Sequence, residues 1–255
     1  MNTNHLTLFA LPGIPDVRPG DDVGRLLLAA LDQAGVTLQD GDVVAIAQKI
    51  ISKAEGRLVD LAGVVPGERA RELARQTDKD PRLVELILRE SDEVSRVRPG
   101  VIIVRHRLGF TSANAGIDRS NVGPDGEERV LLLPVDPDAS AHRIRDLFIT
   151  ERNVALGVVI TDSHGRPFRL GTVGVAIGVA GLPALWDRRG EADRYGYRLQ
   201  HTDVGVADEI AAAAGLLMGQ AAEGQPAVLL RGLRLPFVDG RASDLVRPKD
   251  LDLYR

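Results

Sequence analysis

The sequence predicts a globular protein of the α+β class, and three observations support that prediction. Its 255 residues are 44% hydrophobic with a mean hydropathy of -0.04, which supplies apolar side chains for one large or two small cores. Short β-rich runs and segments with helical periodicity are both present along the chain. No internal repeat, low-complexity tract or flexible linker separates them.

Helical periodicity is present in five segments. The first, 23–34, has apolar residues at helical spacing, an acidic residue, Asp22, that can cap its start, and Gly35 at its end. Two further segments begin with a proline, whose missing amide donor costs little in the first turn of a helix. The predicted helices are 23–34, 66–77, 81–90, 140–150 and 204–217.

β-rich runs predict the strands. The run 43–51 follows the Asp40-Gly41 turn and leads directly into the polar segment 52–57, so we expect a strand that delivers a polar loop. The other runs are shorter and are bounded by polar or glycine-containing segments. The predicted strands are 6–10, 43–51, 101–105, 130–135, 155–161 and 227–230.

Charge and composition argue against several classes of protein. Lys and Arg are interspersed with acidic residues at a net charge of -4, which does not favour binding to nucleic acid. The absence of cysteine excludes disulfides, thiolate metal sites and a cysteine nucleophile. The longest apolar-looking stretch, 170–183, is rich in glycine and shorter than the ~20 residues that span a bilayer. The N-terminus lacks the basic region of a signal peptide, so we expect a cytoplasmic protein without a membrane partner.

Common signatures of phosphate binding, nucleophilic catalysis and zinc binding are absent. The sequence has no P-loop, no Gly-x-Gly-x-x-Gly and no Gly-x-Ser-x-Gly. Its five histidines are scattered, and no two have the i, i+4 spacing that places two imidazoles on one metal. A ligand must therefore be bound by another framework.

Polar residues gather instead in four clusters near the ends of predicted strands and helices, where loops present side chains from a rigid scaffold. The clusters are 48–57, 111–121, 161–166 and 218–225. In the first, Lys53 can place a point charge on phosphate oxygens, although a solvated lysine is an equally ordinary interpretation. The chain has only four lysines against 28 arginines, and two of the four, Lys49 and Lys53, lie in this cluster.

The second and third clusters each contain a candidate metal ligand. Asp118 lies among small and hydroxyl residues and can offer a hard oxygen to Mg²⁺ or Mn²⁺, although the same composition is typical of a turn. Asp162 follows an apolar strand, a common position for a metal ligand or a base, and the alternative there is a cap. Arg166 or Arg169 can neutralise a transferred phosphate or be a surface residue.

The fourth cluster, 218–225, closes the last predicted helix. Taken alone it is a glycine-bounded helix C-terminus. Its polar residues Gln220 and Glu223 can also contact a ligand, and the sequence leaves both interpretations open.

In their order and spacing, these clusters resemble the coenzyme F420-0:L-glutamate ligase family, and the resemblance covers essentially the whole chain. No single motif is as diagnostic as a P-loop, but long matches in register are together highly specific. Because the chain ends soon after the last motif, we expect the stand-alone form, without the nitroreductase-like domain of some members. The matching segments are LPGIPDVRPGDD, GDVVAIAQKIISKAEGR, GFTSANAGIDRSNV, VVITDSHGRPFRLGTVGVAIGVAG, LWDRRGEADRYGYRL and TDVGVADEIAAAAGLLMGQAAEGQPAVLLRG.

The resemblance implies a GTP-dependent ligase. Such an enzyme forms an amide between L-glutamate and the lactyl carboxylate of coenzyme F420-0 through an acyl phosphate, and it can add further γ-linked glutamates. Two divalent ions, Mg²⁺ or Mn²⁺, are implied at the site, with K⁺ as a further candidate. The resemblance also implies two α+β subdomains with mixed sheets, packed as a homodimer. Because the first and last motifs both serve the nucleotide, we expect a discontinuous nucleotide domain, 1–80 plus 205–255, around an inserted domain, 81–204, that carries metal ligands.

Residue by residue, the resemblance assigns Asp118 and Asp162 to one metal, and Ser163 and Gln220 to the second. Lys53, Asp118 and Asp162 are the expected catalytic residues, and His164 is a candidate base. Many relatives have Thr at position 163 and Ser-Thr at positions 48 and 49, so this chain differs there but keeps polar atoms. The residues assigned to GTP are Leu11, Pro12, Gly13, Ile14, Gln48, Lys49, Lys53, Asn121, Met218, Gly219, Gln220, Ala221, Ala222, Glu223, Gly224 and Gln225.

Three rival functions remain at this point: a related ligase with another acidic acceptor, a non-catalytic deazaflavin- or nucleotide-binding protein, and a metal-dependent phosphohydrolase. The ligase requires its two aspartates to meet in space. A separation of Asp118 and Asp162 beyond ~10 Å would exclude shared metal coordination.

Overall fold

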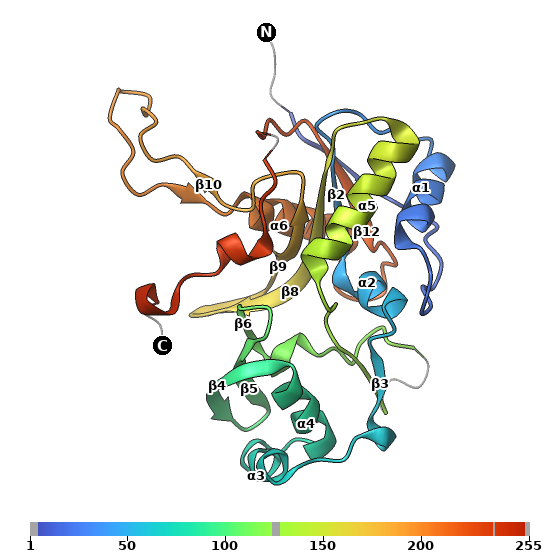
Figure 1. The fold of residues 1–255 in the computed structure, drawn as a ribbon, viewed down its shortest axis with the longest axis vertical. Coiled ribbons are helices and arrows are strands. Elements are labelled where there is room, and N and C mark those ends of the chain that lie inside the picture. Colours follow the sequence, from blue (N-terminus) through green and yellow to red (C-terminus); the bar gives the residue numbers. More distant parts are fainter. Residues whose placement is uncertain (1–4, 124–127, 237, 253–255) are drawn as a thin grey trace.

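A five-stranded mixed sheet with the strand order β1-β12-β2-β8-β9 forms the centre of the protein (Figure 1). The computed structural model describes residues 5–123, 128–236 and 238–252. Only β2 and β8 are parallel neighbours, and the other pairs are antiparallel. The strands are β1 (Thr7–Ala10), β2 (Val43–Ala47), β8 (Gly157–Arg166), β9 (Arg169–Ala180) and β12 (Ala227–Arg231).

Helices cover both faces of this sheet, which explains why β2, β12 and the segments 157–160 of β8 and 176–180 of β9 are apolar and mostly buried. Successive side chains of a strand point to opposite faces. Val44 and Ile46 therefore join the core under helices α1 (Val23–Gln33) and α5 (Pro137–Arg152), whereas Val43 and Ala45 join the core under α6 (Val206–Met218).

Glycines in β9 allow the helices on both faces to approach closely. A Cβ added to Gly174 would lie 2.4 Å from the carbonyl oxygen of Ala211 in α6, and one added to Gly178 would lie 2.5 Å from that of Pro137 in α5. The glycine-rich composition of 170–183 therefore reflects packing between helix and sheet.

A second group of elements lies below the central sheet in the view of Figure 1 and has its own core. Apolar residues of several of these helices and strands, among them Val84, Ile87, Ile102 and Val104, form that core. A two-stranded pair, β3 with β7, lies beside it. The elements are β3 (Leu58–Asp60), α3 (Glu68–Thr77), α4 (Pro81–Arg89), β4 (Ser91–Arg98), β5 (Val101–His106), β6 (Thr111–Ala113) and β7 (Arg129–Leu131).

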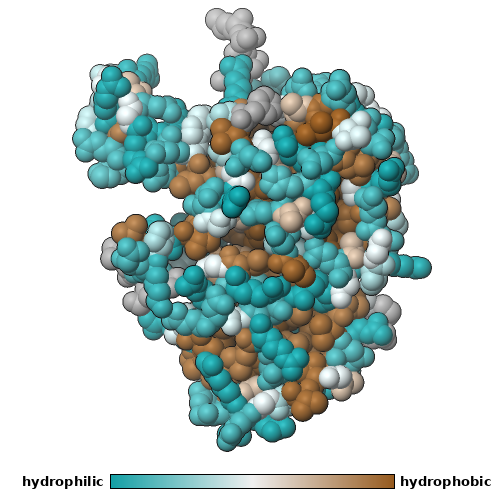
Figure 2. Space-filling model, in the orientation of Figure 1, coloured by the Kyte–Doolittle hydropathy of each residue, from teal (hydrophilic) through white to brown (hydrophobic). Residues whose placement is uncertain are grey.

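A two-stranded arm, β10 (Trp186–Asp187) with β11 (Asp203–Val204), projects from the body (Figure 1), and its surface in Figure 2 is mainly hydrophilic. The chain then passes through α6 and β12 to two short 3-10 helices, η3 (Ala242–Leu245) and η4 (Lys249–Leu251). No helix in the described part of the chain is long and apolar enough to cross a membrane.

The observed elements confirm the α+β class and most of the predicted segments. Predicted helix 23–34 is α1, with Asp22 accepting from the amide of Arg25, and predicted helix 81–90 is α4, with proline in its first turn. The helix expected from Pro66 begins at Glu68, because Gly67 takes the cap position. The expected strand 130–135 ends at Leu131.

Two predicted loops were wrong, and both lie at the functional site. The run 43–51 is a strand only to Ala47, and Gln48–Ala54 then forms helix α2, so Lys53 lies on a helix and not at the start of a loop. The cluster 161–166 is not a loop after a strand, because β8 continues through Arg166 in a long hairpin with β9. β8 and β9, from the predicted insert 81–204, share a sheet with β2 and β12; the proposed division into domains stays a prediction.

Candidate functional site

A cleft of about 1030 Å³ collects the predicted site residues from all four clusters. Its walls come from the loop 14–19, helix α2, the loop 118–123, the middle of β8 and the segment 218–226 after α6. Leu11, Pro12 and Gly13 do not line it, and the Leu11 side chain is fully buried in the core. The predicted residues that line the cleft are Ile14, Gln48, Lys49, Lys53, Asp118, Asn121, Asp162, Ser163, Met218, Gly219, Gln220, Ala221, Ala222, Glu223, Gly224 and Gln225.

Helix α2 places two lysines on the cleft. Ile50 and Ile51 of this helix are buried in the core, which fixes how the helix is rotated about its axis. Lys49 and Lys53 are four residues apart and therefore lie on one face of the helix, one turn from each other. Lys53 has no hydrogen-bond or ion-pair partner among the described residues, so its ammonium group is available to an anionic ligand.

The buried Gln48 side chain connects helix α2 to Asp118. Its Oε1 accepts a hydrogen bond of 2.8 Å from the Ser52 hydroxyl, and its Nε2 donates one of 2.9 Å to Asp118 Oδ2. Because Ser52 lies one turn further along the same helix, it fixes the orientation of the Gln48 amide. The amide in turn holds the carboxylate of Asp118.

Asp118 is a half-buried carboxylate with incomplete charge compensation. Its backbone pairs with Leu131 of β7, and Lys49 Nζ lies 3.4 Å from its Oδ2. Burial raises the pKa of the Asp118 carboxyl, and the negative charge of Asp162 raises that pKa further, against the opposing effect of Lys49. The two aspartates, distant in sequence, therefore interact electrostatically across one cleft.

Asp162 is held by the hairpin of β8 and β9, where its backbone pairs with Val175. The Nε2 atom of His164 lies 2.9 Å from Asp162 Oδ2, and the two side chains are 12% and 10% exposed. His164 does not line the cleft. Its imidazole faces a smaller, second cavity instead, with the ring of Phe110 at a centroid distance of 5.0 Å.

The segment 218–225 forms another wall of the cleft. Asn121 connects this segment to the loop 118–123. Asn121 Nδ2 donates a hydrogen bond of 3.0 Å to the carbonyl of Ala221. Within the turn, the Glu223 carboxylate accepts from the amide of Ala221 at 2.7 Å, and backbone amides lower the pKa of Glu223. The Glu223 side chain thus stabilises the turn itself.

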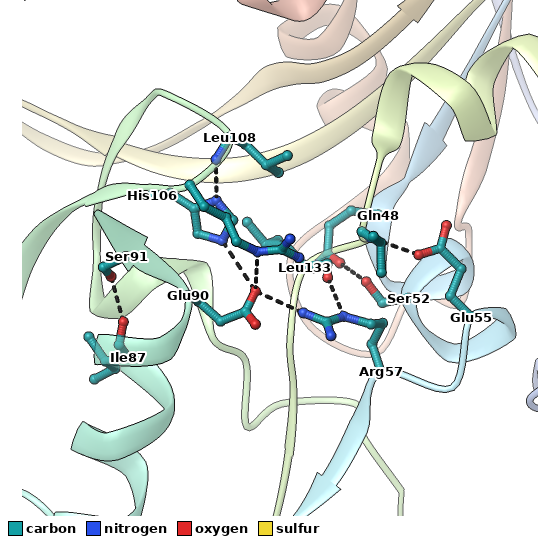
Figure 3. A network of polar contacts seen from close by, with 12 residues as sticks. Gln48, Ser52, Glu55, Arg57, Ile87, Glu90, Ser91, His106, Leu108 and Leu133 are labelled. Carbon is teal, nitrogen blue, oxygen red and sulfur yellow. Dashed lines mark hydrogen bonds and ion pairs between the residues drawn. The ribbon is translucent and has the colours of Figure 1, made fainter. Parts of the chain in front are cut away.

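A network of polar contacts around Glu90 lies beside the Gln48–Ser52 pair (Figure 3). Glu90 Oε2 lies 2.8 Å from Arg57 Nη2, 2.9 Å from Arg107 Nε and 3.7 Å from His106 Nε2. Burial by itself would raise the pKa of Glu90, but the contacts with His106, Arg57 and Arg107 outweigh it and lower the pKa to about 2. Arg57 also donates to the carbonyl of Leu133 at 2.9 Å, so the network ties α4 and β5 to the segment after α2.

His106 connects the network to Asp162. Its Nδ1 accepts a hydrogen bond of 3.0 Å from the amide of Leu108, so the ring proton is on Nε2, toward Glu90. The ring stacks on Phe110 at 5.2 Å and 8°, and Phe110 contacts His164, the partner of Asp162. A series of packed side chains therefore leads from Glu90 to the cleft.

The predicted metal ligands have a donor set that fits a hard divalent cation. Among the described residues, no group of three or more His, Asp or Glu side chains is placed to hold a metal ion. Asp118, Asp162, Ser163 and Gln220 nevertheless all line the cleft, and each offers oxygen, the atom that Mg²⁺ and Mn²⁺ prefer. Burial and the charge of Asp162 raise the pKa of Asp118, and a cation bound between the two carboxylates would favour the charged form of Asp118.

Some lining residues were missed in the sequence. Ser120 accepts a hydrogen bond of 2.9 Å from Lys49 at its hydroxyl, and the loop 15–19 contributes Pro15, Asp16, Val17 and Pro19. The loop 15–19 lies inside LPGIPDVRPGDD, one of the segments that resemble the family, and this resemblance could have indicated its residues as part of the site. Ser52 carried no signal of its own, since its role depends on a helix that was predicted as a loop.

The model of the family described as F420-0:Gamma-glutamyl ligase matches residues 13–232. The chain is 48% identical over 252 residues to the coenzyme F420:L-glutamate ligase of Methanothermobacter thermautotrophicus, covering 98% of this chain and 99% of that protein. It is 47% identical to the enzyme of that name from Methanopyrus kandleri, over 94% and 93% of the two chains, and 44% identical to that of Haloarcula marismortui, over 98% and 96%. The protein belongs to the F420-0:gamma-glutamyl ligase family.

Proposed function

We propose that the protein joins L-glutamate to coenzyme F420-0 in a GTP-dependent reaction, forming an amide with the lactyl carboxylate and adding further glutamates through γ-linkages. The observation that carries this proposal is the meeting of two lysines, two aspartates and the segment 218–225 in one cleft. The lysines supply positive charge for a triphosphate, and the aspartates supply metal ligands beside it. The relatives named coenzyme F420:L-glutamate ligase support the identity of the substrates.

The reaction has two steps. In the first, an oxygen of the acceptor carboxylate attacks the γ-phosphorus of GTP, an O–P bond forms, and GDP leaves with the electron pair of the broken P–O bond. In the second, the amine of glutamate attacks the carbonyl carbon of the acyl phosphate. A C–N bond forms, phosphate leaves with the electron pair of the C–O bond, and the amine proton passes to solvent.

The residues of the chain lower the repulsion in the first step, because the attacking carboxylate and the triphosphate are both anions. Lys53 has no ion-pair partner among the described residues and is assigned to the phosphate oxygens. Lys49, 3.4 Å from Asp118, holds that carboxylate and the Ser120 loop in place. The wall formed by Asn121 and the segment 218–225 closes the nucleotide site from the other side.

Asp118 and Asp162 would hold one divalent cation, Mg²⁺ or Mn²⁺, and Ser163 and Gln220 would contact a second, with K⁺ as a further candidate ion. When bound, these cations supply positive charge to the phosphate oxygens. The homodimer implied by the family resemblance is part of the same proposal, and the mass of the protein in solution, measured by light scattering, tests it.

The test is to incubate the purified protein with F420-0, GTP, Mn²⁺ and labelled glutamate and to determine the product masses. A ligase gives glutamylated coenzyme and releases GDP and phosphate only when both glutamate and acceptor are present. Phosphate release without the amine would indicate a phosphohydrolase, and tight nucleotide binding without any turnover would indicate a binding protein. Turnover with another acidic acceptor, and none with F420-0, would indicate a related ligase.

A further inference from the structure

A second cavity, of about 230 Å³, lies beside the nucleotide cleft and is not part of the predicted site. It is formed by the turn before β6, the β8–β9 hairpin, the first turn of α6 and the segment from η3 to η4. Its polar residues include Thr111, His164, Asp208 and Arg247, and Phe110 and Ile177 are among its apolar residues.

The two cavities share one wall. His164 lines the second cavity, and its Nε2 lies 2.9 Å from Asp162 Oδ2, while Asp162 lines the nucleotide cleft. A ligand in the second cavity that contacts His164 is therefore separated from Asp162, the proposed metal ligand, only by the imidazole of His164.

The second cavity is lined by the carboxylates of Asp208 and Asp252 and by the guanidinium of Arg247, and Asp208 and Arg247 are not paired with each other. Asp208 Oδ1 accepts a hydrogen bond of 2.8 Å from the amide of Ala176, and within the described residues Asp208 has no ion-pair partner. Burial raises the pKa of Asp208, against the opposing effects of the hydrogen bond from Ala176 and of His164. Arg247 is exposed and likewise has no hydrogen-bond or ion-pair partner in the described part of the chain.

Separated opposite charges on one small cavity are complementary to a zwitterion. An α-amino acid carries an ammonium and a carboxylate on one carbon, and the methylene groups of its side chain can contact Val175, Ile177 and Leu245, which line the cavity. The cavity is smaller than the roughly 300–1000 Å³ of pockets that hold drug-sized ligands. Its size therefore fits a small ligand such as an amino acid.

We propose that this second cavity binds the amino-acid substrate, with Asp208 receiving the ammonium group and Arg247 a carboxylate. That the amino acid is L-glutamate rests on the proposed function. The ammonium group is then placed next to His164, on the shared wall, close to where the amine is required. The nucleotide and the amino acid occupy separate cavities, so each can be impaired without the other.

Asp208→Asn tests this assignment, because asparagine keeps the oxygen that accepts from Ala176 and removes only the charge. Glu209→Gln is the matched control: Glu209 is the next residue of α6, is exposed and lines neither cavity. We expect the KM for glutamate to rise at least ~10-fold in Asp208→Asn, with the KM values for GTP and F420-0 within about twofold of wild type. Arg247→Gln should act in the same direction.

An unchanged KM for glutamate in both variants would overturn the proposal, and so would a rise in the KM for F420-0 alone, since the cavity would then hold the acceptor. Equilibrium dialysis with labelled glutamate separates this question from turnover. Binding to the wild-type protein that weakens at least ~10-fold in Asp208→Asn and not in Glu209→Gln supports the cavity even if no ligase activity is found. Equal binding by all three proteins, or no binding to any, refutes it.

Discussion

The Gln48 amide donates a hydrogen bond of 2.9 Å to the carboxylate of Asp118, across 70 residues of sequence, while Ser52 holds the other end of the same amide at 2.8 Å. Gln48 and Ser52 both lie on helix α2, so this helix determines where the amide meets Asp118. The orientation of a predicted metal ligand is thus set by a buried hydroxyl that does not line the cleft itself.

Ser52→Ala should consequently reduce catalysis without touching the substrates. Loss of the hydroxyl leaves the buried Oε1 of Gln48 unsatisfied, which costs about 1–3 kcal/mol of folding stability and frees the amide to rotate away from Asp118. We expect a several-fold lower kcat and a higher requirement for Mn²⁺, measured by steady-state kinetics with varied metal concentration. Ser52→Thr, which restores the donor, should recover part of both; an activity of Ser52→Ala equal to wild type would show that Gln48 is fixed by its surroundings alone.

Asp118→Asn and Asp162→Asn should each abolish turnover and leave the fold intact. Each carboxylate is proposed as a metal ligand, and an amide is a much weaker partner for Mg²⁺ or Mn²⁺. Because burial and the negative charge of Asp162 raise the pKa of Asp118, removing the Asp118 charge relieves an unfavourable charge in the metal-free protein. Thermal unfolding of Asp118→Asn without divalent ions should therefore show an unchanged or higher Tm. Near-normal turnover in either variant would remove the metal assignment.

Lys53→Gln should weaken GTP binding more than it changes stability. Lys53 lines the cleft and has no ion-pair partner among the residues described, so its removal leaves no buried group unpaired. A charge-assisted contact to phosphate is worth about 1.5–3 kcal/mol, which corresponds to a rise of at least ~10-fold in the KM for GTP. The control is Lys249→Gln, whose lysine forms an ion pair with Glu93 on the surface, and there the KM should not change.

The sequence predicted which residues meet at the cleft better than it predicted the elements that hold them. Lys49 and Lys53 both line the cleft, but Lys49 was expected in a strand and Lys53 in a loop, because the β-branched Ile50 and Ile51 made the start of helix α2 resemble a strand. Its seven residues give too little periodicity to distinguish it from the end of a strand. The extension of β8 through Arg166 was missed for a related reason, since it depends on pairing with β9 and not on local composition.

Long-range arrangement was beyond the reach of sequence patterns. Asp208 looks like an ordinary acid in the first turn of a helix, and only the packing of α6 against β9 places it in a cavity beside His164. Strand β4 was missed because charged and polar residues dominate Ser91–Arg98 and most of its side chains are exposed. Both features follow from tertiary neighbours that a local pattern does not contain.

Glu90 should make folding stability depend on pH in the acid range. Its pKa is lowered from 4.5 to about 2 in the folded protein, so the stabilisation is complete above the unfolded pKa and is lost as the pH falls from about 5 toward 2. The shift corresponds to roughly 3 kcal/mol. Urea unfolding at pH 6 and pH 3 should show Glu90→Gln strongly destabilised at pH 6 and closer to wild type at pH 3. Glu209→Gln, at an exposed position, is the control, and a pH-independent difference for Glu90→Gln would contradict the assignment.

Gly219→Ala should distort the segment that closes the nucleotide site. Gly219 has φ +70° and ψ -170°, a backbone conformation that costs residues other than glycine about 1–3 kcal/mol. In addition, a Cβ at this position would clash with the side chain of Glu223. Because Glu223 holds the turn through the amide of Ala221, the clash should displace the wall of the cleft. We expect weaker GDP binding by calorimetry, with little effect on the KM for glutamate. The double variant Gly219→Ala/Glu223→Ala removes the clash, but it keeps the backbone strain and also loses the hydrogen bond from Ala221 to Glu223. Binding by the double variant should therefore stay below wild type. Full recovery would show that the steric clash alone was responsible.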